Sequence, residues 1–197
     1  LNLGGGKGVI IADPNKDKTE ALFRTYGRFV EGLAGRYITA EDVGTSVQDM
    51  EQVRMETKYV TGIDRALGGG GDPSPVTALG VYHGMKASMK ELTGSDSLKG
   101  KTIAVQGAGN VASFLCEHLA KEGANLLITD IYEAKAQTLA NNTKGTYIPP
   151  DKIYDVDADV FCPCALGAVI NDETIARLRV AIIAGGANNQ LADERKH

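Results

Sequence analysis

The chain has 197 residues, of which 43% are hydrophobic and 23% charged, and its formal net charge is -4. This composition is ordinary for a globular protein of one or two domains. The chain has no basic runs that would mark a nucleic-acid partner, and no apolar stretch approaches the roughly 20 residues that cross a bilayer. We therefore expect a cytoplasmic protein with no nucleic-acid and no membrane partner.

The first third of the sequence alternates predicted strands and helices. Gly8 to Ala12 forms an apolar run that predicts a short buried strand. Apolar residues on one helical face predict a helix over 17–33, and 36–39 predicts a further strand. The Ser46 hydroxyl can cap the amide of Asp49, so we predict that a second helix begins there.

A cluster of turn-forming residues at 68–75 interrupts this alternation. We place an interdomain hinge at or just before it, which predicts one domain at 1–66 and another at 67–197. Pro75 suits the first position of a long helix that ends near Leu92.

Strands and helices also alternate in the second domain. Strands are predicted at 102–106, 126–129, 159–161 and 180–184, and helices at 110–121, 133–142 and 171–178. This spacing is typical of a parallel, doubly wound sheet. We therefore predict an α/β fold, in which a Rossmann-like doubly wound domain follows part of another α/β domain.

A glycine-rich turn, Gly107 to Ala112, joins a predicted strand to a predicted helix. Gly107 permits the tight turn, Gly109 lets the backbone approach a pyrophosphate, and Ala112 lets the helix pack closely on the strand. The phosphates would bind the free amides at the helix N-terminus. Alone, the turn would be weak support, but its place between strand and helix predicts a dinucleotide site.

Asp130 ends the next predicted strand, 23 positions after Gly107. An acidic residue at this place can accept hydrogen bonds from the hydroxyls of an adenosine ribose. The same carboxylate would repel a 2'-phosphate, and no arginine neighbours it in the sequence. We therefore predict NAD rather than NADP as the cofactor.

Lys7 follows three glycines and precedes the apolar run. A lysine is ordinarily a solvated surface charge. The bare backbone before it would let a substrate or a partner domain approach, which would desolvate the amine and favour the neutral form that a general base needs. Asp42, in a second polar cluster, is a candidate to exchange protons with a substrate amine, whereas its neighbour Glu41 is equally explained as a first-turn charge of the following helix.

The three cysteines are an odd number and too few for a disulfide framework. The spacing of Cys162 and Cys164 differs from that of a zinc knuckle, and no second Cys or His pair completes four ligands. We expect reduced thiols and no metal site.

The run Leu1 to Pro14 resembles the signature of the glutamate/leucine/phenylalanine/valine dehydrogenase family at every fixed position. Further segments are similar to the members of that family that act on branched-chain amino acids, namely 37–45, 73–78, 106–112, 164–167 and 186–190. The similarity covers nearly the whole chain.

The resemblance implies NAD-dependent, reversible oxidative deamination of L-leucine and other branched-chain L-amino acids to 2-oxo acids and ammonium. It implies a partial substrate-binding (catalytic) domain at 1–66, an NAD-binding Rossmann domain at 67–197, a small amino-acid or 2-oxo-acid substrate, and a homo-oligomer. Lys7 would activate the water that attacks the iminium, and Asp42 would carry protons to and from the nitrogen. The residues implied to bind the cofactor are Gly107, Ala108, Gly109, Asn110, Val111, Ala112, Ser113, Asp130, Thr77, Ala165 and Asn189. Cys162 and Cys164 would either touch the cofactor or pack in the core.

Other readings stay open. A methylene in an apolar pocket discriminates by only ~1 to 3 kcal/mol, so leucine, isoleucine and valine should all be accepted. Phenylalanine or glutamate is an alternative substrate within the same family, and a non-catalytic NAD-binding module is an alternative of another class. The second lysine with which the family holds the substrate carboxylate has no counterpart here, so we expect a piece of a longer chain.

Overall fold

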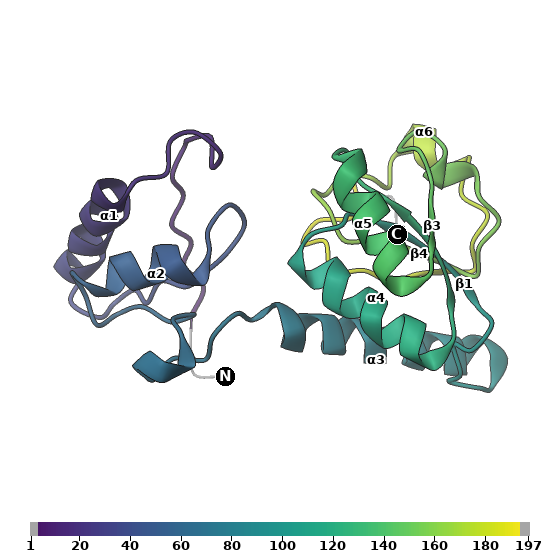
Figure 1. Ribbon diagram of the computed structural model, residues 1–197, viewed down its shortest axis with the longest axis horizontal. Coiled ribbons are helices and arrows are strands. Elements are labelled where there is room, and N and C mark those ends of the chain that lie inside the picture. Colours follow the sequence, from purple (N-terminus) through teal and green to yellow (C-terminus); the bar gives the residue numbers. More distant parts are fainter. Residues whose placement is uncertain (1–3, 194–197) are drawn as a thin grey trace. The chain divides into compact units, whose positions relative to one another are not determined.

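The chain folds into two compact units in a computed structural model that describes residues 4–193 (Figure 1). The boundary falls between Pro73 and Ser74, seven residues later than the predicted one. The glycine-rich segment belongs to the first unit because it folds back on it. The backbone N–H of Gly71 donates to the carbonyl oxygen of Ile63 at 2.9 Å.

The first unit is built on two helices, α1 (Glu20–Gly32) and α2 (Val47–Arg54), followed by the short 3-10 helix η1 (Arg65–Leu67). Helix α1 begins three residues later than predicted because the Thr19 side chain caps it. Helix α2 begins as predicted, after Ser46, in a reciprocal capping box with Asp49. A small core holds the two helices together and consists of Phe23, Met50, Val53, Val60 and Ile63, with Tyr26 packed against it.

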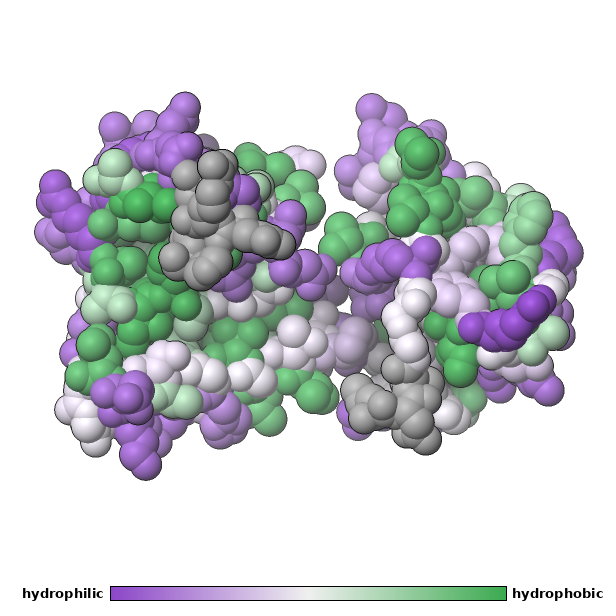
Figure 2. Space-filling view, turned by 180° about the vertical axis from the view of Figure 1, so that it is seen from behind, coloured by the Kyte–Doolittle hydropathy of each residue, from purple (hydrophilic) through white to green (hydrophobic). Residues whose placement is uncertain are grey.

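The predicted strand at Gly8 to Ala12 is wrong. These residues form no strand, and the Val9 and Ile11 side chains are 74% and 99% exposed. A strand needs a neighbour for its backbone hydrogen bonds, and the described part of the first unit offers only a one-residue bridge between Thr39 and Val60. The predicted strand at 36–39 is reduced to that same bridge. The apolar side chains of the first unit's unformed strand therefore stay at the surface. Both units expose apolar residues, as the green areas of Figure 2 show.

The second unit confirms the doubly wound prediction. Its elements, in chain order, are α3 (Ser74–Thr93), β1 (Thr102–Gln106), α4 (Asn110–Glu122), β2 (Asn125–Thr129), α5 (Glu133–Thr143), β3 (Thr146–Tyr147), η2 (Ile153–Asp155), β4 (Val160–Pro163), α6 (Asp172–Ile175) and β5 (Ile182–Ile183). The five strands are all parallel, in the order β3-β2-β1-β4-β5. Strand β3 was not predicted, and α6 and β5 are shorter than predicted.

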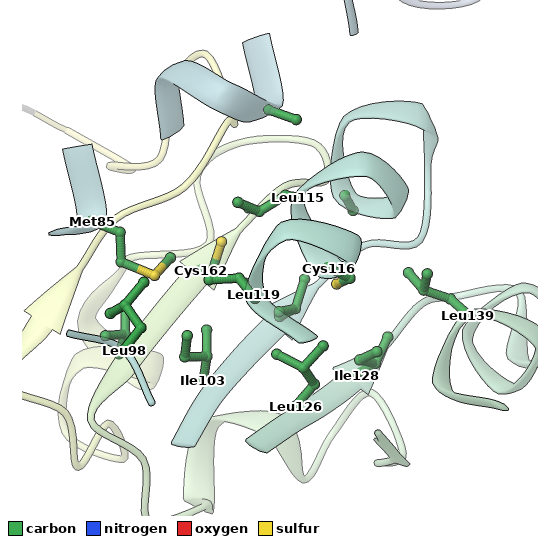
Figure 3. Close-up of a cluster of buried hydrophobic side chains, with 14 of the residues drawn as sticks. Met85, Leu98, Ile103, Leu115, Cys116, Leu119, Leu126, Ile128, Leu139 and Cys162 are labelled. Atoms are coloured by element: carbon green, nitrogen blue, oxygen red, sulfur yellow. The ribbon is translucent and has the colours of Figure 1, made fainter. Parts of the chain in front are cut away.

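The core of the second unit covers both faces of the sheet. Ile103 and Val105 of β1 belong to a cluster with side chains of α3, α4 and α5, part of which Figure 3 shows. Ala104, which lies between them, belongs to a separate cluster with Phe161 and Ile153. This alternation is the period of two expected of a strand buried on both faces.

Because the strands are parallel, the turns that follow β1, β2, β4 and β5 meet at one edge of the sheet. Ligands of open parallel sheets bind at this edge, where the strand order reverses. No helix within residues 4–193 is both long and apolar enough to cross a membrane.

Candidate functional site

The glycine-rich turn after β1 begins at a position where only glycine fits. Gly107 has φ = 110°, and its N–H donates to the carbonyl oxygen of Thr129 at 2.8 Å. A Cβ on Gly107 would lie 2.9 Å from both the carbonyl carbon and the carbonyl oxygen of Cys164. The turn is therefore locked between β2 and the loop that follows β4.

Gly109 caps α4 without any side-chain hydrogen bond, and its backbone is extended, with φ = -82°. A Cβ there would meet no protein atom within 4 Å. The space that a side chain at Gly109 would occupy is therefore free of protein atoms. The first backbone N–H groups of α4, at Asn110, Val111 and Ala112, have no acceptor within the helix, and they carry the positive end of the helix dipole. This arrangement suits a phosphate.

The Ser113 hydroxyl donates back to the Gly109 carbonyl oxygen at 2.9 Å. It therefore stabilises the first turn of α4, and the same oxygen also accepts the Ser113 N–H at 2.9 Å.

Asp130 stands at the end of β2 and holds the turn from the other side. One carboxylate oxygen accepts the Ala108 N–H at 2.7 Å, and the other accepts the Tyr132 N–H at 2.8 Å. Each oxygen keeps a second lone pair, with which it can accept a ribose hydroxyl.

Two buried polar atoms lie at this edge without a partner in the described part of the chain, Gln106 Oε1 and Thr129 Oγ1. The two residues face each other in the register of β1 and β2 and directly precede the turn and Asp130. Buried polar atoms are nearly always hydrogen-bonded. The two atoms are therefore unsatisfied polar groups directly beneath the glycine-rich turn and Asp130. Sequence reasoning missed both, although each ends a predicted strand next to a predicted site residue.

The loops after β4 and β5 supply the remaining predicted residues of this edge. Ala165 is exposed and follows Cys164, whose N–H donates to the Gln106 carbonyl oxygen at 2.7 Å. Asn189 is also exposed, and its carbonyl oxygen accepts the Ala168 N–H at 2.6 Å. The two loops are thus hydrogen-bonded to β1 and to each other.

Thr77 lies in the first turn of α3 and is exposed. One turn further along α3, Val81 lies 3.7 Å from the place of a Cβ on Gly186, in the loop after β5. The first turns of α3 therefore lie at the same edge as this loop.

All three cysteines are free, and the Sγ atoms of Cys162 and Cys164 lie 3.6 Å apart. Burial raises the pKa of Cys116 to about 12, so this thiol is a core side chain. Cys162 is fully buried as well, which bears out its packing role. Within residues 4–193, no group of three or more His, Cys, Asp or Glu side chains is placed to hold a metal ion.

In the first unit, the Lys7 ammonium donates to a carboxylate oxygen of Asp42. The structure therefore brings together the two candidate catalytic side chains of the first unit. The two side chains are 64% and 46% exposed, so the first unit by itself does not desolvate them. A tight turn holds Asp42, because its N–H donates to Thr45 Oγ1 at 2.9 Å and its other carboxylate oxygen accepts the Val43 N–H at 2.7 Å.

Glu41 is not a first-turn charge of α2, because that helix begins only at Val47, where Ser46 caps it. Partial burial raises the pKa of Glu41, the negative charge of Asp72 raises it further, and Lys18 opposes both. Glu41 is therefore a half-buried carboxyl group that directly precedes Asp42 in the chain.

Two family models match the chain. The model described as "Glu/Leu/Phe/Val dehydrogenase, dimerisation domain" matches residues 1–59. The model described as "Glutamate/Leucine/Phenylalanine/Valine dehydrogenase" matches residues 68–131 and 127–197. Together they cover nearly all of the sequence, as the resemblance of its motifs implied.

Individual relatives agree with the family models. The leucine dehydrogenase of Thermoactinomyces intermedius is 61% identical over 99% of this chain and 53% of its own length. The phenylalanine dehydrogenase of Lysinibacillus sphaericus is 47% identical over 99% of this chain and 52% of its own. Among solved structures, that of L-tryptophan dehydrogenase from Nostoc punctiforme matches with a TM-score of 0.72 at 44% identity, over 98% of this chain and 55% of its own. The chain thus spans about half the length of the curated relatives it matches.

Proposed function

Because the chain belongs to the glutamate/leucine/phenylalanine/valine dehydrogenase family, we propose that the full-length protein is an NAD-dependent dehydrogenase of L-leucine and other branched-chain L-amino acids. The ion pair between Lys7 and Asp42 is the observation that carries this proposal. It joins an amine and a carboxylate that are 35 residues apart in the sequence. The higher identity to a leucine dehydrogenase than to a phenylalanine dehydrogenase supports the choice of substrate.

The reaction consumes an L-amino acid, NAD and water, and it yields a 2-oxo acid, ammonium, NADH and a proton. Bound NAD supplies the hydride acceptor for the α-carbon of the substrate. All other steps are proton transfers and charge stabilisation, which side chains perform.

Asp42 first accepts a proton from the substrate ammonium group, because hydride can leave only an α-carbon whose nitrogen has a free electron pair. Asp42 keeps this proton beside the nitrogen while hydride leaves the α-carbon. The protonation of Asp42 ends its ion pair with Lys7. Once Lys7 has released its own proton to solvent, its amine takes a proton from the water that attacks the resulting iminium carbon. Asp42 returns its proton to the nitrogen, which leaves as ammonia while the carbon–oxygen double bond forms. The hydroxyl proton lost in this step converts the ammonia to ammonium.

The second unit supplies the groups that would hold the dinucleotide. The free amides at the start of α4 suit the pyrophosphate, and the bare backbone of Gly109 leaves room for it. The Asp130 carboxylate suits a ribose with free hydroxyl groups and disfavours a ribose 2'-phosphate. We include NAD rather than NADP, and a homo-oligomeric assembly, in the proposal.

A substrate panel tests the proposal. The full-length protein is assayed for NADH formation with L-leucine, L-valine, L-isoleucine, L-phenylalanine, L-tryptophan and L-glutamate at fixed NAD. We expect kcat/KM for the three branched-chain substrates to exceed that for the others at least about tenfold, because pocket size separates them by ~1 to 3 kcal/mol. A highest value for phenylalanine, tryptophan or glutamate would reassign the substrate. NAD binding without turnover of any amino acid would contradict the proposal and support the alternative of a non-catalytic NAD-binding module.

The same assay with NADP in place of NAD tests the cofactor. We expect NADP to support at most a few per cent of the rate, because a charge-assisted contact to Asp130 is replaced by repulsion. Equal rates with both nucleotides would contradict the assignment of Asp130.

A further inference from the structure

The segment that carries Lys7 is held by the rest of the first unit at very few points. Residues 4–12 are exposed and lie outside any strand. Within the described part of the chain, their backbone makes a single hydrogen bond, from the Gly8 N–H to the Tyr37 hydroxyl at 2.9 Å. Gly8 directly follows Lys7, so this bond fixes the backbone at the base of the lysine side chain.

The glycines on either side of Lys7 allow the segment to lie directly on aromatic rings. A Cβ on Gly6 would lie 3.0 and 3.2 Å from two ring carbons of Tyr37. A Cβ on Gly8 would overlap the Tyr26 hydroxyl and lie 3.2 Å from that of Tyr37. The absence of both side chains therefore lets the segment lie close against the two tyrosines.

Thr39, two residues after Tyr37, is held by both its side chain and its backbone. The Tyr26 hydroxyl, from α1, hydrogen-bonds the Thr39 hydroxyl at 3.0 Å. The Thr39 backbone is bonded on both sides, because its N–H donates to the Tyr59 carbonyl oxygen at 3.0 Å and its carbonyl oxygen accepts the Thr61 N–H at 2.8 Å.

The hydroxyl of Tyr37 is suited to accept the Gly8 N–H. Burial of Tyr37 opposes its ionisation, but the hydroxyls of Tyr26 and Thr39, the Gly8 N–H and the positive charge of Lys7 together hold the pKa of Tyr37 below its usual value. All of these neighbours favour negative charge on the Tyr37 oxygen.

The segment 37–42 therefore holds Lys7 at two places, the backbone beside it and its ammonium group. Tyr37 accepts a hydrogen bond from the backbone beside it, and Asp42, five residues further on, binds its ammonium group. We infer that Tyr37 is a positioning residue, whose hydroxyl sets the place of Lys7 relative to Asp42. This inference rests on the proposed function, in which both groups transfer protons, and a displacement of about 1 Å can cost a reaction up to about a hundredfold.

The test replaces Tyr37 by phenylalanine in the full-length protein, which removes the hydroxyl and keeps the ring over Gly6. We expect kcat with L-leucine to fall about tenfold, while KM, the Kd for NAD and the melting temperature stay close to those of the wild type. Tyr59→Phe is the matched control, because the Tyr59 hydroxyl makes no hydrogen bond within residues 4–193. We expect this control to keep the wild-type kcat.

A second readout needs neither cofactor nor turnover. The full-length protein is treated with a limiting amount of acetic anhydride, and acetylation of each lysine is followed by mass spectrometry. We expect Tyr37→Phe to raise the acetylation rate of Lys7 severalfold, because the amine spends less time bound to Asp42. Lys16, which is paired with Asp13 at 3.0 Å and lies away from Tyr37 in the sequence, should react at an unchanged rate.

Three results would overturn the inference. The first is a kcat for Tyr37→Phe equal to that of Tyr59→Phe. The second is a loss of kcat in Tyr37→Phe that a lower melting temperature explains. The third is a raised KM of Tyr37→Phe with unchanged kcat. They differ from a failure of the proposed function, in which the wild type itself forms neither NADH nor ammonium from any amino acid.

Discussion

Replacing Lys7 by alanine in the full-length protein is expected to lower kcat for L-leucine about a thousandfold and to leave the Kd for NAD unchanged. General acid–base groups contribute on the order of a hundredfold to ten-thousandfold to a rate, and Lys7 is the only amine that the first unit pairs with Asp42 within the described residues. Nucleotide binding should persist because its groups belong to the second unit, at the ends of β1 and β2. Turnover is measured by NADH absorbance and binding by calorimetric titration.

Lys16→Ala is the matched control for this substitution. Lys16 is also an exposed lysine of the first unit, and it is paired with the carboxylate of Asp13 at 3.0 Å. Loss of such an exposed pair has little effect on stability, and no step of the proposed reaction uses it. Wild-type turnover in Lys7→Ala, or an equal loss in both variants, would show that Lys7 performs no chemistry.

Replacing Gly109 by alanine is expected to weaken NAD binding on the order of a hundredfold without unfolding the protein. The new methyl group meets no protein atom within 4 Å, and the backbone there has φ = -82°, which any residue adopts. It would instead occupy space that the pyrophosphate needs in order to reach the free amides of α4. Losing one or two charge-assisted hydrogen bonds, at about 1.5 to 3 kcal/mol each, corresponds to this change in affinity.

Gly84→Ala, in the middle of α3, is the control for the added methyl group. A Cβ on Gly84 also meets no protein atom within 4 Å. Alanine favours the helix over glycine by roughly 1 kcal/mol, so this variant should be slightly more stable and bind NAD normally. NAD affinity in Gly109→Ala equal to that in Gly84→Ala would place the pyrophosphate elsewhere.

The second unit was largely predictable because its signals are local. Each long strand is an apolar run followed by a turn, and the glycine-rich turn carries its own backbone requirement at Gly107. The capping box of Ser46 with Asp49 was predictable for the same reason, since its two residues are three positions apart. The two-residue strand β3 was missed because its pairing with β2 is a tertiary contact with hardly any sequence pattern.

The first unit was less predictable because its site depends on contacts between distant residues. The apolar run after Lys7 resembles a strand in the sequence, yet a run alone does not supply the neighbouring strand that would bury it. Gly8 and Tyr37 are 29 residues apart, and no periodic pattern of apolar residues predicts the hydrogen bond between them. Lys7 and Asp42 were singled out as separate candidates in the sequence, because a separation of 35 residues predicts no contact until the fold is known.

Whether Lys7 and Asp42 act as one unit is decided most directly by a double-mutant cycle on kcat for L-leucine. The wild type, Lys7→Ala, Asp42→Asn and the double variant are compared under identical conditions, with NAD binding measured in all four. If the two side chains share the proton transfers, the double variant should be no more than about threefold slower than the slower single variant. If the two losses multiply instead, or if either single variant keeps the wild-type rate, the pair does not carry the chemistry.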